Sequence, residues 1–272
     1  MTKIIKIYCE GKKGSHDYDI LEKVIIGLLS VQIDPIGSLR GAGAIIQHKE
    51  KEVSESDFKI LFRDRDFDKP IPQNPILEKD EVRQYVCYSY RNTIENYLFD
   101  TKIFFNFLQK KSLCEKYSLN SGDDVKNKFI EAAEKIKYYQ AVRHTMGKMR
   151  TGKTDFGTKL TEKSGKLPES LEEEFCKNEA LKKICQANLL ANGWNEDAFL
   201  KIYSQFVESY HTNFMINLSF LIHFQGKDFA SSLKLLLPNF PLKSYYKFAK
   251  KYFDYSQFPD LVQLRKLIKN HL

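Results

Sequence analysis

Short apolar runs alternate with helical patterns through about the first hundred residues of the chain. Strands are predicted at residues 3–9, 31–36, 60–62 and 84–90. Between the first two, apolar residues recur at three- and four-residue steps from Asp17 to Leu29, which predicts a helix with Asp17 available as its N-cap. A short helix is expected over Ala44 to Glu52. Alternation of this kind is typical of an α/β fold in which helices flank a parallel sheet.

The pattern changes from Thr101 onward, where apolar residues keep helical spacing over most of the remaining chain. The exception is the run Phe220 to Asp228, which resembles a late strand and turn that returns to the first sheet. C-terminal helices are expected from Ala230, from Lys243 and from Asp260. We therefore predict three parts: an α/β core over residues 1–105, a mainly α-helical insertion over 106–216, and a return to the core with C-terminal helices over 217–272.

Composition indicates a globular protein with no membrane segment. The 272 residues are 42% hydrophobic and 29% charged, and no stretch approaches twenty uncharged apolar residues. The first strand pattern starts at Lys3 without a signal peptide before it, so a cytoplasmic location is expected. The five cysteines form no C-x-x-C pair, which argues against a disulfide framework or a zinc site. A net charge of +8 is consistent with a polyanionic partner such as nucleic acid.

Acidic residues follow two of the predicted strands. Glu10 comes directly after the first, and Asp64, Asp66 and Asp68 follow the strand at residues 60–62. If strand alternation continues, the three aspartates project to one side, with Arg63, Arg65 and Phe67 on the other. A divalent cation relieves the repulsion between such carboxylates, and Mg²⁺ prefers oxygen ligands. The alternative is an acidic, solvated loop.

These motifs, in this order, resemble those of the Toprim fold, which topoisomerases, primases and a group of nucleases share. Glu10-Gly11 and Asp64-x-Asp66 carry the resemblance, and two later motifs look like those of Toprim nucleases of the OLD (overcoming lysogenization defect) type. The two later motifs are Arg91-x-x-Ile94-Glu95-Asn96-Tyr97-Leu98 and Gly226-Lys227-Asp228. The layout is similar to standalone Toprim effectors of anti-phage defence systems such as PARIS, which are paired with an ABC-type ATPase. The middle helices carry no such motif.

The resemblance implies a metal-dependent nuclease that hydrolyses phosphodiester bonds in DNA or RNA, tRNA included. It also implies a role in anti-phage defence and an ABC-type ATPase as partner, and a homodimer is left open. The alternative is a non-catalytic Toprim-like module that binds nucleic acid or protein and is regulated by an ATPase.

Phosphodiester cleavage assigns a role to each acid, because it needs activated water and cations that absorb charge on the phosphate. We expect Asp64 and Asp66 to bind one Mg²⁺ or Mn²⁺, and Glu10 to be a ligand or the general base. Asp68 is an outer-shell or second-metal candidate. Glu95 could bind a second ion, or it could be an ordinary acid at a helix N-terminus.

Two basic residues complete the predicted site. Lys227 could face the phosphate in the transition state, or it could be an ordinary lysine in a turn. Arg91 could bind phosphate, or it could pair with a neighbouring acid.

A stretch from Arg143 to Lys166 is predicted to be a flexible basic loop, with seven Lys/Arg against two acids. It could follow a phosphate backbone or be a solvated linker. The candidate contacts are Arg143, Lys148, Arg150 and Lys153. Gly147 to Thr154 fits the P-loop pattern G-x-x-x-x-G-K-[ST], but the run before it has helical spacing, whereas a P-loop follows a strand. We therefore disfavour a nucleotide phosphotransferase.

Overall fold

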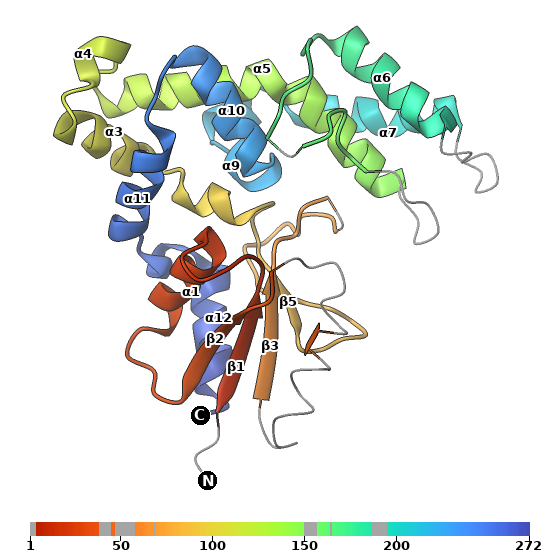
Figure 1. The fold of residues 1–272 in the computed structure, drawn as a ribbon. Coiled ribbons are helices and arrows are strands. Elements are labelled where there is room, and N and C mark those ends of the chain that lie inside the picture. The colour runs from red at the N-terminus through yellow and green to blue at the C-terminus, as the bar shows by residue number, and fades with distance from the viewer. Residues whose placement is uncertain are drawn as a thin grey trace. The chain divides into compact units, whose positions relative to one another are not determined.

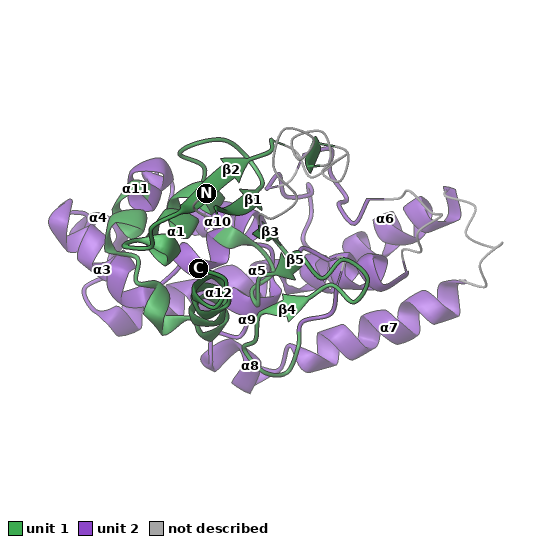
Figure 2. Cartoon of the chain, turned by 90° about the horizontal axis from the view of Figure 1, so that it is seen from below, with its two compact units in different colours: residues 1–65, 72–94, 247–272 green, residues 66–71, 95–246 purple. Residues whose placement is uncertain are grey.

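The computed structural model describes residues 4–37, 45–46, 58–67, 69–149, 157–163, 165–186 and 195–272. The chain forms two compact units, coloured separately in Figure 2. Unit 1 comprises residues 1–65, 72–94 and 247–272, and unit 2 comprises residues 66–71 and 95–246. The first unit therefore ends at Ile94, earlier than the predicted boundary at residue 105, and the chain returns to it at Lys247 instead of residue 217.

Unit 1 contains a five-stranded sheet in the order β2-β1-β3-β5-β4 (Figure 1). Its strands are β1 (Ile5–Cys9), β2 (Val31–Pro35), β3 (Phe58–Arg63), β4 (Glu78–Lys79) and β5 (Val86–Tyr88). The β2, β1, β3 and β5 strands run parallel, which confirms the predicted parallel sheet, and β4 is an antiparallel edge strand. The two-residue β4 was not predicted because it is too short to show a period.

The central strands are apolar because both of their faces are buried, as is usual for parallel sheets. On one face Tyr8, Leu61 and Tyr88, from three adjacent strands, pack together with Ile36 and Val86. On the other, Ile7 and Ile60 are completely buried. The sheet thus positions the residues that directly follow β1, β3 and β5.

Two helices of unit 1 pack against each other, and one of them also packs against β2. The first, α1 (His16–Ile25), is capped by Ser15, whose Oγ accepts a hydrogen bond from the Tyr18 backbone N–H at 3.3 Å. The prediction that Asp17 caps this helix is therefore wrong, because the cap lies two residues earlier, at Ser15. The second is α12 (Pro259–Lys269), with Pro259 at its first position.

Contacts at both ends of α12 fix its direction along the sheet. Near its start, Asp260 Oδ2 accepts a hydrogen bond from the Tyr90 backbone N–H at 2.9 Å, just after β5. Near its end, the His271 ring stacks on Phe58 at the start of β3, with centroids 3.6 Å apart. The helix therefore runs antiparallel to the strands. The short 3-10 turn η3 (Tyr255–Gln257) precedes α12 in the sequence.

Unit 2 is helical, as predicted for the middle of the chain. After the 3-10 turn η1 (Ile94–Leu98) come α3 (Thr101–Lys110), α4 (Cys114–Tyr117), α5 (Gly122–Met149), α6 (Glu173–Gln186), α7 (Glu196–Ser209), α8 (Thr212–Ile216), α9 (Phe220–His223), α10 (Gly226–Leu236) and α11 (Leu242–Tyr252). The boundary with unit 1 falls within α11. Helix α5 is the centre of the unit, because α3, α6, α7, α8 and α10 all pack on it.

The predicted late strand over residues 220–228 is wrong. These residues form α9 and the first turn of α10. Phe220 and Phe224 are fully buried among other aromatic rings of unit 2, including Phe214 and Phe229. A short apolar run reads equally well as a strand or as a buried helix, and here the aromatic packing of a helical unit decides.

The helix expected over residues 44–52 lies mostly outside the described residues. Residues 45 and 46 have helical backbone geometry. No helix in the described part of the chain is long and apolar enough to cross a membrane.

Candidate functional site

The sheet of unit 1 brings two predicted carboxylates to the same edge. In the parallel pair of β1 and β3, Tyr8 lies opposite Leu61. Glu10 follows β1 directly, and Asp64 follows β3 directly. Both residues therefore lie at the carboxyl ends of neighbouring strands, where functional groups gather in open parallel sheets. Asp64 is only 8% exposed, whereas Glu10 is half-buried.

Further acids lie around the end of β1. The buried thiol of Cys9 has its pKa raised to about 12, first by burial and then by the nearby carboxylates of Asp17, Asp34 and Glu10. Asp34 is on β2, opposite Tyr8, and Asp17 is on the buried side of α1. Asp34 was not among the predicted site residues. It could have been predicted from its position, because it is an acid near the end of the strand predicted at residues 31–36.

Asp64 and Asp66 do not continue the strand, so the prediction that strand alternation places them on one side is wrong. Strand β3 ends at Arg63, and Asp66 has a φ of 49°, in the left-handed region that Asp adopts more readily than most residues. Because the chain turns at Asp66, strand alternation stops there. Asp64 belongs to unit 1 and Asp66 to unit 2, and Asp68 lies outside the described residues.

The buried side chain of Arg65 stabilises the turn after β3 through a hydrogen bond and an ion pair. Its Nε donates to the Ser89 backbone carbonyl at 3.1 Å, and its Nη1 lies 2.8 Å from Glu78 Oε2. The side chain is completely buried. Arg65 therefore links the ends of β3 and β5 with β4 and supports the position of Asp64.

A second predicted pair comes together inside unit 2. Lys227, in the first turn of α10, places its Nζ 3.5 Å from Oε1 of Glu95, in η1. The Glu95 side chain is 6% exposed, and that of Lys227 is 53% exposed. A hydrogen bond of 2.9 Å from Asn96 Nδ2 to the Phe224 carbonyl holds the same two segments together. Two motifs separated by about 130 residues in the sequence thus form one local arrangement.

The free oxygen of Glu95 distinguishes this carboxylate from an ordinary ion pair. Its Oε2 is buried and accepts no hydrogen bond from a described residue. Burying a carboxylate oxygen without a donor is unfavourable, so such an oxygen is a natural ligand position for a cation or a water. Glu95 also lies in the first turn of η1, as the alternative of an acid at a helix N-terminus expected.

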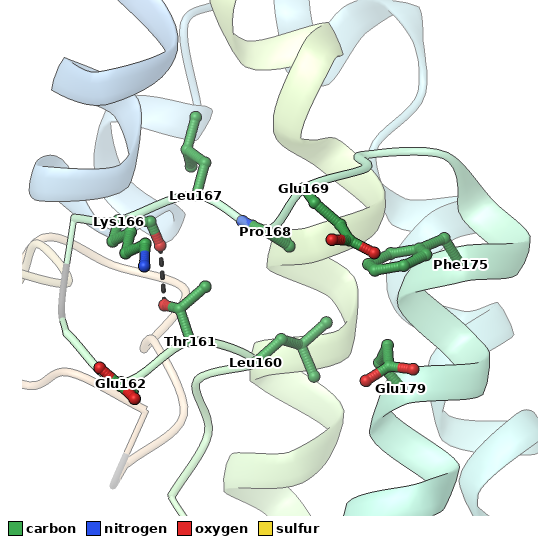
Figure 3. A pocket seen from close by; sticks show the side chains of 9 residues that line it. All are labelled: Leu160, Thr161, Glu162, Lys166, Leu167, Pro168, Glu169, Phe175 and Glu179. Atoms are coloured by element: carbon green, nitrogen blue, oxygen red, sulfur yellow. Dashed lines mark hydrogen bonds between the residues drawn. The ribbon is translucent and has the colours of Figure 1, made fainter.

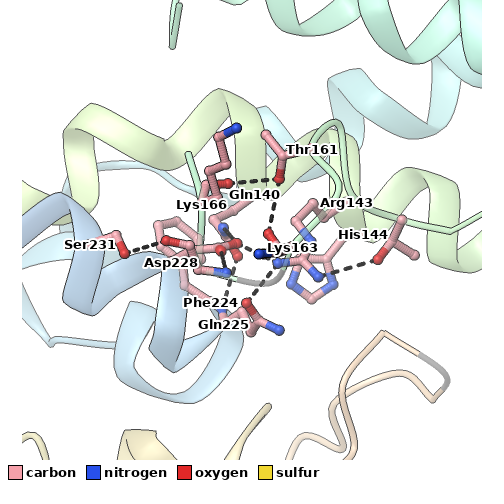
Figure 4. Close-up of polar contacts among 12 residues, drawn as sticks. Gln140, Arg143, His144, Thr161, Lys163, Lys166, Phe224, Gln225, Asp228 and Ser231 are labelled. Carbon is pink, nitrogen blue, oxygen red and sulfur yellow. Dashed lines mark hydrogen bonds and ion pairs between the residues drawn. The ribbon is translucent and has the colours of Figure 1, made fainter. Parts of the chain in front are cut away.

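The Gly226-Lys227-Asp228 motif divides between surface and interior. Asp228 is fully buried and forms an ion pair with Arg143 of α5. It also accepts hydrogen bonds from Gln140 Nε2 at 2.8 Å and from the Gly165 backbone N–H at 3.2 Å, as Figure 4 shows in part. Asp228 therefore has a structural role, and Lys227 is the member of the motif that reaches solvent.

Arg143 is not a surface contact for nucleic acid, and this prediction is wrong. It lies within α5 and is 3% exposed. Besides its ion pair with Asp228, it donates to Gln225 Oε1 at 2.8 Å (Figure 4). Its guanidinium lies 4.3 Å from the centre of the Phe67 ring. Residues 143–149, which were predicted to open a basic loop, belong to α5, which continues to Met149.

The other predicted nucleic-acid contacts have mixed outcomes. Lys148 is exposed in the last turn of α5. Arg91 is half-buried, with its guanidinium 4.9 Å from the centre of the Phe258 ring. Arg150 and Lys153 lie outside the described residues.

The P-loop-like string starts inside a helix, whereas the sequence predicted a loop from Arg143 onward. The run before the string is helical, as its spacing predicted. Gly147 and Lys148 belong to α5, and residues 150–154 lie outside the described part of the chain. A Cβ at Gly147 would lie 2.5 Å from the Phe67 carbonyl oxygen. This glycine therefore allows close packing between a helix and a neighbouring segment, which is a different task from binding phosphate.

A surface hollow of about 480 Å³ lies elsewhere in unit 2, between α6 and the segment before it (Figure 3). Leu160, Leu167, Pro168 and Phe175 supply its apolar walls, and Glu162, Lys166, Glu169 and Glu179 its charges. It contains none of the predicted site residues. One of its three carboxylates, that of Glu179, pairs with Lys182 at 2.7 Å.

Among the described residues, no group of three or more His, Cys, Asp and Glu side chains is arranged to hold a metal ion. A comparison with protein-family models gives no match to the chain, and neither does a comparison with curated proteins.

Proposed function

We propose that this chain is a metal-dependent phosphodiesterase of the Toprim type that cleaves nucleic acid. The observation that carries the proposal is the pairing of β1 with β3, because it sets Glu10 and Asp64 at adjacent strand ends. The resemblance of Glu10-Gly11 and Asp64-x-Asp66 to the Toprim motifs supplies the reaction class. The net charge of +8 suits a polyanionic substrate.

The chemistry of the donor set at this edge suits a hard cation. Glu10, Asp64 and Asp34 offer carboxylate oxygens, whereas the thiol of Cys9 is kept protonated by a pKa raised to about 12. Oxygen donors without a thiolate favour Mg²⁺ or Mn²⁺ over softer metals. Such an ion would supply an acidified water and neutralise charge on the phosphate. Asp66 and Asp68 are kept as further candidate ligands.

The protein side chains divide the remaining tasks. Half-buried Glu10 can accept a proton from the attacking water, while Asp64, which is 8% exposed, is held by the end of β3. In unit 2, Glu95 restrains the Lys227 ammonium at 3.5 Å, and the exposure of Lys227 lets it approach an anionic oxygen. Its positive charge would stabilise the phosphate in the transition state.

The test is cleavage of labelled RNA and DNA with Mg²⁺, with Mn²⁺ and with EDTA. We expect Glu10→Gln and Asp64→Asn each to lower the cleavage rate by about 10³-fold or more, because a lost ligand or general base removes transition-state stabilisation. Glu81→Gln, an exposed acid of unit 1, is the matched control and should retain full activity. Undiminished cleavage in both site variants would show that these carboxylates are not catalytic.

The same assay tests the alternative of a non-catalytic Toprim-like module. That alternative expects binding of nucleic acid without cleavage under any of the metal conditions, and no effect of Glu10→Gln on binding. The role in anti-phage defence and the ABC-type ATPase partner rest on the resemblance alone and stay predictions.

A further inference from the structure

Helix α11 (Leu242–Tyr252) has an unusual charge pattern. Its eleven residues include four lysines and neither Asp nor Glu. The wider segment from Phe240 to the C-terminal Leu272 contains seven Lys/Arg against two Asp. Much of the excess positive charge of the chain is therefore concentrated in this segment.

Three of the four lysines form one exposed row along the helix. Lys243, Lys247 and Lys251 follow one another at four-residue intervals, and all three are exposed. At a rise of 1.5 Å per residue, neighbouring members are about 6 Å apart along the axis, so the row covers about 12 Å. Because the row lies on one continuous helix, helix geometry alone fixes this spacing.

The fourth lysine of the helix, Lys250, has a structural role. Lys250 forms an ion pair with Asp19 of α1 and lies 3.5 Å from the Gly14 carbonyl oxygen. In contrast, Lys243, Lys247 and Lys251 form no ion pair with any residue that the structure describes. The Lys251 Nζ lies 5.7 Å from the centre of the Tyr252 ring.

The helix does not need the row in order to fold. Its buried side is formed by Tyr245 and Ala249, and Tyr245 donates a hydrogen bond of 2.6 Å to the Leu98 carbonyl. Like charges four residues apart slightly destabilise a helix. The row is thus slightly unfavourable in the protein alone, and a polyanion would remove that penalty.

We propose that the row of Lys243, Lys247 and Lys251 binds the phosphate backbone of a nucleic acid. The inference rests on the proposed function only in taking nucleic acid as the ligand. Phosphates along a strand offer negative charges at a comparable spacing, and lysines bind them without reading sequence. Tyr252, 47% exposed beside Lys251, adds a ring on which a base can stack.

A membrane surface fits this helix less well. A helix that lies on a membrane turns its apolar side outward, into the lipid. The apolar side of α11 is buried in the protein, with Tyr245 and Ala249 completely covered. The exposed side therefore offers charge with little apolar surface.

The experiment measures binding of a labelled single-stranded oligonucleotide of about 20 nucleotides by fluorescence anisotropy, in EDTA, over a range of salt concentrations. The variant replaces Lys243, Lys247 and Lys251 together by Gln. Loss of three phosphate contacts should make the slope of log K against log salt less negative by about 2. We expect the affinity at moderate salt to fall by about tenfold or more.

The matched control replaces Lys128, Lys177 and Lys182 together by Gln. Each of these lysines pairs with a glutamate of its own helix, so the change in net charge is the same but no free row is lost. The control should keep the slope of the unmodified protein. An unchanged slope in the α11 variant, or binding to anionic phospholipid vesicles but not to the oligonucleotide, would overturn the inference.

These results separate the inference from the proposed function. Binding that depends on the row, in a protein that never cleaves, would support the inference and refute the proposed nuclease. Cleavage that persists with binding independent of the row would refute the inference alone.

Discussion

The two candidate groups of this protein are positioned by different means. In unit 1, Glu10 and Asp64 take their places from the backbone, because parallel strand pairing fixes where each strand ends. In unit 2, Glu95 and Lys227 lie on a 3-10 turn and a helix that are joined through side chains. Backbone pairing tolerates many side chains, whereas a side-chain network depends on each of its members.

The difference has a consequence for how mutations should act. The network around Asp228 joins α5, α10 and residue Gly165, all within unit 2. Removing one member of such a buried network leaves its partners without hydrogen bonds or with an unpaired charge. Stability in unit 2 should therefore respond more sharply to single polar substitutions than stability in unit 1.

The largest effect is expected from breaking the buried ion pair between Arg143 and Asp228. Arg143→Met leaves the Asp228 carboxylate buried without a cation, and Asp228→Asn leaves the guanidinium uncompensated. Each single change should lower the free energy of unfolding by about 3 to 5 kcal/mol. Urea denaturation followed by circular dichroism measures this quantity.

The double variant supplies the control for that prediction. With Arg143→Met and Asp228→Asn combined, this pair carries no buried charge. The single amide oxygen of Asn replaces only one of the two carboxylate oxygens that accept hydrogen bonds from Gln140 and Gly165. We expect the double variant to be no less stable than either single variant. Losses that simply add would show that the two side chains are not coupled.

A sizeable effect is also expected from acid, through two histidines of unit 2. Burial lowers the pKa of His144 to about 3 and that of His223 to about 4, and for His144 the neighbouring His223 and Arg143 lower it further. Below the ordinary histidine pKa near 6.5, the unfolded chain takes up protons that the folded chain does not. Stability should therefore fall as pH drops from about 6.5 towards 4, by about 1.4 kcal/mol per pH unit for each group.

The measurement is the urea midpoint of the protein between pH 7 and pH 4.5. His144→Phe should reduce the steepness of the pH dependence by about half, since the ring at this position stacks on Phe206 with a centroid distance of 5.0 Å and needs no charge. His211→Phe, an exposed histidine outside this cluster, is the matched control. Equal steepness in the His144 variant and the unmodified protein would contradict the assignment.

The sequence predicted most of what the backbone determines. Strong periodicity located β1, α1 and the helical character of the middle region, and the strand ends located Glu10 and Asp64. These features depend on local spacing, which is visible in the sequence. The run at 220–228 was misassigned because a short apolar stretch has no unambiguous period.

The features that escaped prediction depend on contacts between distant residues. Arg143 and Asp228 are 85 residues apart, so nothing near either one indicates a buried pair. Asp66 leaves the strand alternation through its own left-handed backbone, which residue type alone does not decide. Side-chain networks and turns, which depend on such contacts, are therefore harder to predict from the sequence than the strands and helices are.

The smallest of these effects is expected at Gly147, where the backbone of α5 touches Phe67 within unit 2. In Gly147→Ala the new Cβ would lie 2.5 Å from the Phe67 carbonyl oxygen, so helix or turn must shift. Overpacking of this kind costs about 1 to 3 kcal/mol of unfolding free energy. Gly122→Ala, at the start of the same helix with nothing within 4 Å of its new Cβ, is the matched control and should be neutral or slightly stabilising. If both variants unfold at the same urea concentration, close packing is not the reason for glycine at position 147. A role of Gly147 in the P-loop-like string would then have to be tested.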